Sequence, residues 1–221
     1  MESYCILETL SNSIKVGDFT VTTNAETDGY GALTVQDAIS CFLNFAQGRQ
    51  FTNALEWCCG PGYFGFAALH SKLTKQITFS DISEHAQSVM LQSIQVNNLD
   101  CKFYLSDNFK NIPKQKFDLI IANPPHFNFT VPNWRDDLQV SEHEPRKMRD
   151  LNWDIHRDFF NNVNDYLTQD GKIMLMENCT GSTPETFIDM IEKNNLEITN
   201  FAKSILHSDF VYYIEIAKNG S

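Results

Sequence analysis

The sequence has 221 residues, enough for one domain with a full hydrophobic core. Apolar residues make up 42% of it, yet no apolar run reaches the roughly 18 residues that span a bilayer, so a membrane protein is not expected. The formal net charge of -11 disfavours bare nucleic acid as a partner, because an acidic surface repels phosphates. The N-terminus lacks the basic and apolar stretches of a signal peptide, and we therefore expect a cytoplasmic protein.

Apolar runs alternate with amphipathic segments from Phe51 onward, which is typical of an α/β fold with a parallel sheet. The expected strands cover residues 53–58, 76–81, 102–105, 117–122, 172–176, 196–201 and 210–216. The expected helices cover residues 35–45, 63–70, 83–97, 153–167 and 183–193, with a turn at Asp170-Gly171. Because no helix separates the last two strands, the last strand should run antiparallel.

The expected domain organisation is simple, because no linker rich in Gly, Pro or Ser divides the chain. We expect one compact domain, in which residues 1–50 form an N-terminal flap and a helix that pack on a core at residues 51–221. The six cysteines are scattered and form no Cys-x-x-Cys pair, so they are interpreted as small apolar residues. No set of metal ligands is apparent, and no metal is expected.

A glycine turn follows the first core strand. Gly60, Gly62 and Gly65 satisfy the pattern Gly-x-Gly-x-x-Gly, and Asp81 ends the next strand. Glycines let the backbone of such a turn approach a ligand, and an acid about 20 residues further on accepts ribose hydroxyl hydrogens. Taken alone, this pattern fits NAD as well as S-adenosylmethionine (SAM).

Glu56 separates the two cofactors in our interpretation, because it stands where the first strand meets the ligand. A carboxylate there would repel a pyrophosphate. It would favour the α-amino group and the sulfonium of SAM. The alternative for Glu56 is an ordinary carboxylate at the end of a strand.

The segment from Glu56 to Gly65 resembles the first motif of class I SAM-dependent methyltransferases, an acid followed by a glycine-rich turn. The resemblance covers roughly residues 54–216. It implies a Rossmann-like fold with a mostly parallel seven-stranded sheet, an antiparallel last strand and helices on both faces. The cofactor contacts that it implies are Gly60 and Gly62 on the methionine moiety, Asp81 on the ribose, Ile82 on the adenine, and Asp107 with Asn108 at the adenine amino group. Cys58 replaces the first glycine of the family pattern and would narrow the methionine end of the site.

Asn123-Pro124-Pro125-His126 follows the fourth core strand. It resembles the Asn-Pro-Pro-aromatic motif of methyltransferases that act on planar nitrogens, namely exocyclic amines of nucleobases and the side-chain amide of glutamine. The Asn123 oxygen and the Pro124 carbonyl can each accept an acceptor N–H, which orients the nitrogen for in-line displacement. Asn123 is also expected to border the cofactor. The alternative is a rigid turn that ends a strand.

His126 stands where the motif usually has Tyr or Phe. Its ring can stack on a planar substrate or take up the proton released after methylation, and Phe127 can supply the stacking instead. Residues 127–151 form a long polar segment, which we interpret as a lid over the substrate, with Phe127 and Trp134 as contacts. Tyr30, between two glycines, would reach the substrate from a mobile flap, although an ordinary turn before a helix fits equally well.

The predicted function is therefore SAM-dependent methylation of an amide or amine nitrogen. A protein glutamine, a nucleobase and a small metabolite stay open as acceptors, with protein or small molecule favoured over bare nucleic acid, and the need for a partner subunit is open. Two other classes are considered. A catalytically silent SAM-binding partner subunit would bind without turnover, and an NAD-linked oxidoreductase is disfavoured by Glu56 and by the closing strand pair.

Overall fold

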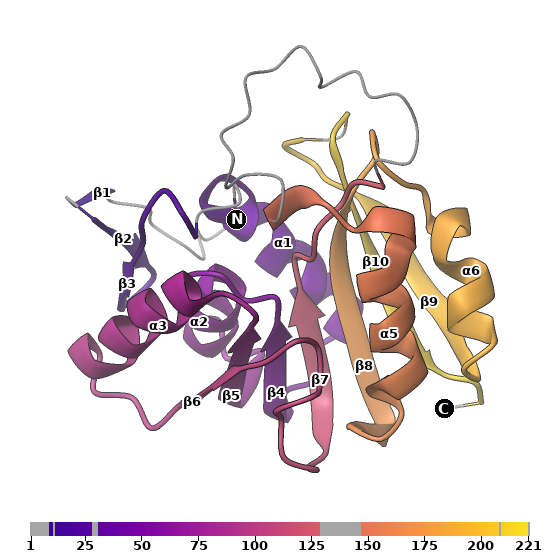
Figure 1. Ribbon diagram of the computed structural model, residues 1–221, viewed down its shortest axis with the longest axis horizontal. Coiled ribbons are helices and arrows are strands. Elements are labelled where there is room, and N and C mark those ends of the chain that lie inside the picture. The colour runs from indigo at the N-terminus through magenta and orange to yellow at the C-terminus, as the bar shows by residue number, and fades with distance from the viewer. Residues whose placement is uncertain (1–8, 11, 28–30, 129–146, 208, 221) are drawn as a thin grey trace.

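The computed structural model describes residues 9–10, 12–27, 31–128, 147–207 and 209–220. Its centre is a seven-stranded sheet in the order β6-β5-β4-β7-β8-β10-β9 (Figure 1). The strands are β4 (Phe51–Trp57), β5 (Thr74–Asp81), β6 (Lys102–Leu105), β7 (Phe117–Ala122), β8 (Leu167–Asn178), β9 (Leu196–Lys203) and β10 (Val211–Lys218). Only β10 pairs antiparallel with its neighbours, β8 and β9, among these strands. The predicted mostly parallel sheet with an antiparallel last strand is confirmed.

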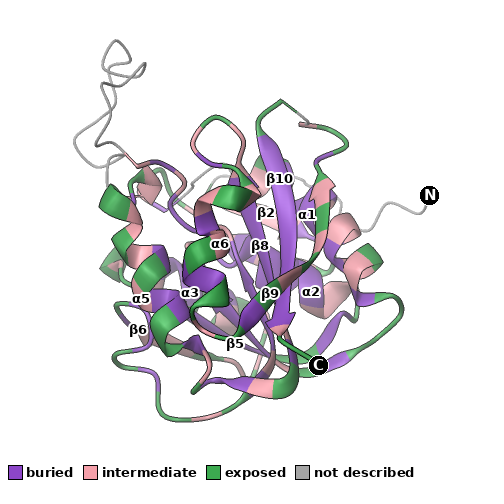
Figure 2. Ribbon diagram, turned by 90° about the vertical axis from the view of Figure 1, so that its right-hand side faces the viewer, coloured by how far each residue is buried: buried purple, intermediate pink, exposed green. Residues whose placement is uncertain are grey.

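Helices cover both faces of the sheet, as predicted. The core on one face includes residues of α1 (Gly31–Ala46), α2 (Tyr63–His70) and α3 (Glu84–Val96), and the core on the other includes residues of α5 (Asp154–Val163) and α6 (Pro184–Glu192). Adjacent residues of β4 serve both cores, since Ala54 belongs to the first and Leu55 to the second. Burial on both faces explains the continuous apolar runs of the sequence, and Figure 2 shows the buried β8 and β10 between helices that carry exposed residues. No helix within the described part of the chain has the length and apolar character that crossing a bilayer requires.

The described N-terminal residues pack directly on this core. A small antiparallel sheet contains β1 (Thr9–Leu10), β2 (Ser13–Val16) and β3 (Phe19–Thr22), which sequence reasoning did not predict. Val16 and Val21 are fully buried in the same core as α1 and α2. The backbone N–H of Thr22 donates to Ser93 Oγ on α3 at 2.8 Å. The small sheet is therefore fixed against the α3 side of the molecule.

The structure corrects the boundaries around β8. The predicted turn at Asp170-Gly171 is wrong, because both residues lie inside β8. The β7–β8 register shifts between Phe117 and Leu119, so a bulge accommodates the turn-forming residues within the strand. The helix predicted to continue to residue 167 ends at Val163, and β8 begins four residues later.

Candidate active site

The two motifs leave adjacent strands at the same edge of the sheet. β4 and β7 pair in parallel, with Trp57 opposite Ala122. Cys58 and Asn123, the next residue of each chain segment, therefore begin neighbouring connections at the carboxyl edge, where ligands bind in open α/β sheets. The two prolines that follow Asn123 are buried, which fixes the backbone direction there.

Glu56 holds the glycine turn against α2. Its Oε2 accepts a hydrogen bond from the N–H of Gly65 at 2.7 Å, and its Oε1 accepts one from Phe64 at 3.3 Å. Burial raises the pKa of Glu56 to about 8, although these hydrogen bonds act to lower it. The Glu56 side chain therefore occupies first-turn N–H groups of α2, the donors that bind pyrophosphate in dinucleotide enzymes. The geometry thus gives Glu56 a structural role at the turn, and its attraction of the cationic groups of SAM stays a prediction.

The glycines of the turn are required for different reasons. Gly60 and Gly62 have φ values of +49° and +84°, in the left-handed region that favours glycine. A β-carbon at position 62 would lie 2.3 Å from the Cε of Met90, and one at position 65 would lie 2.5 Å from the Oε2 of Glu56. Gly62 and Gly65 are therefore required by packing inside the protein, so the predicted contact of Gly62 with the methionine moiety is not its main constraint.

Cys58 adopts φ +52° at the start of the turn. A non-glycine residue in this left-handed conformation costs about 1–2 kcal/mol, which explains why the family pattern has glycine here. Burial raises the pKa of the Cys58 thiol, so the thiol stays protonated. The side chain contributes bulk without charge beside the turn.

Asp81 links the turn to the end of β5. Its Oδ2 accepts from the N–H of Gly60 at 2.8 Å, and its Oδ1 accepts from Ser83 at 2.9 Å. Burial raises the pKa of Asp81. Each carboxylate oxygen retains acceptor capacity for a ribose hydroxyl. The next residue, Ile82, is 69% exposed and offers an apolar surface to an adenine ring. These residues fit SAM.

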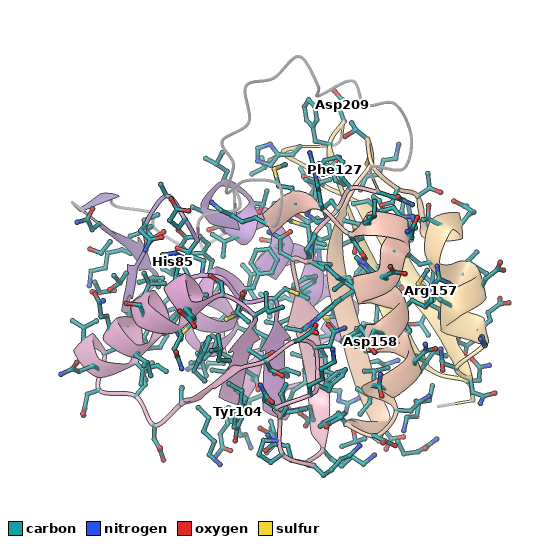
Figure 3. The ribbon with its side chains drawn as sticks, viewed as in Figure 1. His85, Tyr104, Phe127, Arg157, Asp158 and Asp209 are labelled. Atoms are coloured by element: carbon teal, nitrogen blue, oxygen red, sulfur yellow. The ribbon has the colours of Figure 1, made fainter. Side chains whose placement is uncertain are left out.

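Asp107 and Asn108 have partners within the protein. Asp107 is exposed and accepts from Lys110 Nζ at 2.5 Å. Asn108 is buried, accepts from the indole N–H of Trp57 at 2.8 Å, and donates to Asp158 Oδ2 on α5 at 2.7 Å. Figure 3 shows Asp158 on the helix that borders this connection. The Asn108 side chain thus joins β4 to α5, and an adenine contact from it would have to come from its backbone.

The N-terminal segment borders both motifs. A β-carbon on Gly60 would lie 3.0 Å from the carbonyl oxygen of Thr27. A β-carbon on Gly31 would lie 3.8 Å from Nδ2 of Asn123. The residues on either side of the predicted flap therefore lie beside the glycine turn and the Asn-Pro-Pro-His motif. Tyr30 itself lies outside the described residues.

The ends of the predicted lid meet at its base. The N–H of Phe127 donates to the carbonyl of Met148 at 2.9 Å, and the Phe127 carbonyl accepts from Asp150 N–H at 3.0 Å. Phe127 is buried and lies in the upper part of the molecule in Figure 3, below Asp209. Trp134 belongs to residues 129–146, which lie outside the described part of the chain, so its predicted substrate contact stays a prediction.

A chain of hydrogen-bonded side chains runs from Asn123 into the protein. Asn123 Oδ1 lies 2.7 Å from Nε2 of His126, and Nδ1 of His126 lies 3.2 Å from Oε2 of Glu177. The other oxygen of Glu177 lies 3.0 Å from Nε2 of His156, whose Nδ1 lies 2.5 Å from Oδ2 of Asp150. These hydrogen bonds connect the Asn-Pro-Pro-His motif to side chains in the interior of the protein.

Sequence reasoning missed the three inner members of this chain. Burial would lower the pKa of His156, but the facing carboxylates of Glu177 and Asp150 outweigh it and raise the pKa to about 9. Burial would likewise raise the pKa of Glu177, but the facing rings of His156 and His126 lower it. The available signal was a single carboxylate at the end of the apolar run in β8.

Comparisons with known proteins agree with this fold. Residues 23–132 match the family model described as Methyltransferase small domain. Over 95 residues, 42% of this chain and 28% of the relative, the chain is 35% identical to the ribosomal protein uL3 glutamine methyltransferase of Francisella tularensis. Over 71 residues, 32% of this chain and 21% of the relative, it is 39% identical to ribosomal RNA small subunit methyltransferase C of Haemophilus influenzae. A SAM-dependent methyltransferase from Clostridium acetobutylicum has a similar structure, with a TM-score of 0.62, 12% identity, and coverage of 84% of this chain and 92% of that one.

The fold is that of SAM-dependent methyltransferases, and the family match and the relatives indicate a methyltransferase that uses SAM. Its residues 23–132 correspond to a methyltransferase small domain. The chain spans about a quarter of the length of the curated relatives that it matches.

Proposed function

We propose that this protein transfers the methyl group of SAM to a planar amide or amine nitrogen. The observation that carries the proposal is the position of Asn123 at the carboxyl end of β7, next to the turn that follows β4. Gly60 and Asp81 would hold the cofactor on one side of this edge, and Asn123 with Pro124 would hold the acceptor on the other. The glycine turn would thus bind SAM, and the Asn-Pro-Pro-His motif would bind the methyl acceptor.

An amide or aryl amine needs orientation because its lone pair is delocalised. The Asn123 oxygen and the Pro124 carbonyl each accept one acceptor N–H, which holds the nitrogen about 3 Å from the methyl carbon. Bound SAM supplies an activated methyl group, whose bonding electron pair stays with the sulfur. As positive charge develops on the nitrogen, the two oxygens stabilise its N–H groups. His126, whose Nε2 lies 2.7 Å from Asn123 Oδ1, orients this oxygen, and the methylated nitrogen releases one proton to solvent.

A protein side chain or a small molecule is the acceptor class that we favour over bare nucleic acid. The net charge of -11 opposes binding of a phosphate backbone without a basic partner. One relative is named for a glutamine acceptor and another for ribosomal RNA, so both planar-nitrogen classes belong in the test. The Asn-Pro-Pro sequence opposes a catalytically silent partner subunit, because such a subunit has no need to grip an acceptor.

The test uses SAM with a labelled methyl group and a panel containing a glutamine peptide, nucleosides, an RNA and small primary amides. Asn123→Ala should abolish transfer while changing the affinity for S-adenosylhomocysteine (SAH) less than about twofold, since the cofactor contacts lie mainly on the other loops. Asn44→Ala, at an exposed position of α1, is the matched control and should behave like the wild type. Retained transfer by Asn123→Ala would refute the role of this residue.

A further inference from the structure

The side chain of Asn123 is connected to four residues that lie far apart in the sequence, which we call the buried network. His126 follows β7, Glu177 lies near the end of β8, His156 lies in the first turn of α5, and Asp150 precedes η1 (Leu151–Trp153). The His126 side chain is 14% exposed, and the side chains of the other three residues are fully buried. The network therefore extends from the core to the Asn-Pro-Pro-His motif.

The direction of the hydrogen bonds is set at the inner end of the network. Asp150 accepts from the backbone N–H of Ile155 at 2.8 Å and from that of His156 at 3.0 Å, so the first turn of α5 fixes its carboxylate. The Nδ1 of His156 lies 2.5 Å from the same carboxylate and donates to it as well. Asp150 is thus the acceptor in each of these contacts.

Glu177 accepts on both of its oxygens. Its Oε1 lies 3.0 Å from Nε2 of His156, and its Oε2 lies 3.2 Å from Nδ1 of His126. Burial acts to raise the pKa of Glu177, but the two facing rings lower it, so this group is ionised and has no proton to donate. Both histidines therefore donate to Glu177, and the direction of the hydrogen bonds is the same along the network.

The last bond of the network fixes which end of the Asn123 amide faces His126. With Nδ1 of His126 donating to Glu177, its Nε2 lies 2.7 Å from Oδ1 of Asn123, an atom that can only accept. An N–H on Nε2 also balances the charges, because Glu177, Asp150 and an imidazolium at His156 would otherwise leave one net negative charge removed from water. The ring thus holds the oxygen of Asn123, and not its amide nitrogen.

This orientation decides what Asn123 offers to a ligand. An amide oxygen has two lone pairs, and His126 uses one of them, so the other is left for an N–H of the methyl acceptor. The amide nitrogen is directed to the start of α1, where a β-carbon on Gly31 would lie 3.8 Å from it. An amide rotated by half a turn would present its own N–H groups and would oppose those of the acceptor.

We propose that the four residues of the buried network are positioning residues, which hold the Asn123 amide with its oxygen available to the methyl acceptor. This inference rests on the proposed function for its place in the reaction. The network takes part in no covalent step, because it acts through Asn123 alone. Breaking the network should therefore weaken methyl transfer while the cofactor contacts stay in place.

The first test measures the mobility of side-chain NH2 groups in the free wild type by nitrogen NMR relaxation. Asn123 should have the order parameter of a rigid group, about 0.85, and Asn44, exposed on α1, should lie below about 0.6. Asn97 is the rigid reference, because its amide bonds to both the N–H and the carbonyl of Thr20. A mobile Asn123 would overturn the proposal, and this result does not depend on the folding of any variant.

The second test repeats this measurement on three variants. Glu177→Gln replaces one acceptor oxygen of the network with an NH2 group, and His126→Phe keeps a planar ring but removes the N–H that faces Asn123. Glu192→Gln is the matched control, since it removes a charge from an exposed position on α6. The order parameter of Asn123 should fall below about 0.6 in the first two variants only, while an unchanged Asn97 shows an intact fold. An equally rigid Asn123 in all three variants would overturn the proposal.

The third test connects the network to methyl transfer. The kcat should fall at least about tenfold in Glu177→Gln and His126→Phe, because a small displacement of the groups that orient an acceptor has an effect of this size. The Kd for SAH should change less than about twofold, and Glu192→Gln should behave like the wild type. An unchanged kcat with a lower midpoint of denaturant unfolding would overturn the proposal, since it would show a role in stability alone.

The measurements also separate this inference from the proposed function. If the wild type methylates no acceptor of the panel while Asn123 loses its order in Glu177→Gln and His126→Phe, the proposed function fails and the positioning of Asn123 stands. If methyl transfer is found and Asn123 is mobile in the wild type, the inference fails and the proposed function stands.

Discussion

Glu56 accepts a hydrogen bond from the backbone N–H of Gly65 at 2.7 Å, across the start of α2. A helix N-terminus has unpaired N–H groups and a partial positive charge, which makes it an anion site. Here the protein's own Glu56 carboxyl group takes that place, so the turn is adapted to a ligand without phosphate next to the helix. The preference for SAM over a dinucleotide is thereby connected to Glu56, which is buried.

The pH dependence of stability should reveal this buried carboxyl. The folded pKa of about 8 lies above the usual value of 4.5, so the group contributes stability that is fully present below pH 4.5 and is lost as the pH rises to about 8. We expect the loss to be on the order of 4 kcal/mol. Denaturant unfolding of the wild type and Glu56→Gln from pH 4 to pH 9 measures it. The free energy of unfolding of Glu56→Gln should lack this part of the pH dependence. Parallel curves of this free energy against pH for the two proteins would contradict the raised pKa of Glu56.

Packing under the glycine turn can be measured separately from backbone strain. Gly62 and Gly48 have almost the same φ, +84° and +83°, but no atom lies within 4 Å of a β-carbon at Gly48. Both Ala variants bear the left-handed strain, and only Gly62→Ala also meets Met90 and Phe79. Gly62→Ala should therefore lower the free energy of unfolding by about 1–3 kcal/mol more than Gly48→Ala. Equal losses would show that the site is loosely packed.

The two acids assigned to the cofactor should differ in importance. Asp81 bonds to the glycine turn and faces the expected ribose, so Asp81→Ala should weaken SAH binding at least about tenfold, the equivalent of 1.4 kcal/mol. Asp107 is exposed and paired with Lys110, so Asp107→Ala should weaken binding by less than about threefold. Isothermal titration calorimetry with SAH measures both. A larger loss in Asp107→Ala than in Asp81→Ala would reverse the assignment.

Cofactor choice can be tested by titrating the wild type with SAH and with NADH. SAH should bind and NADH should not, because Phe64 and Gly65 present N–H groups already occupied by Glu56. Circular dichroism melting at several ligand concentrations is an independent measure, since a ligand that binds the native state raises Tm. Stabilisation by NADH at concentrations where SAH has no effect would exclude the assigned class.

The sheet could be predicted because its strands are apolar on both faces. The run at residues 117–122 and the two motifs that follow β4 and β7 fixed the expected carboxyl edge from local information. The short strands β2 and β3 escaped prediction because four residues give little periodicity. Asp170-Gly171 has the composition of a turn, but the pairing of Leu167 and Lys172 with β7 on either side places it in a bulge within β8.

The inner part of the site could not be read from the sequence. Glu177, His156 and Asp150 are separated along the chain and converge only when α5 packs beside β8. The aromatic residues of the α5 segment were interpreted as core, which Phe159 and Phe160 confirm by their complete burial. A histidine among core aromatics gives no indication of its partners until the strand order is known.

The crystal structure of the protein with SAH tests the central claim most directly. We predict that the SAH ribose lies on Asp81 and that its sulfur lies within about 8 Å of Asn123 Oδ1, the distance that an in-line acceptor nitrogen can bridge. An SAH molecule bound elsewhere, or a sulfur directed away from Asn123, would contradict the account.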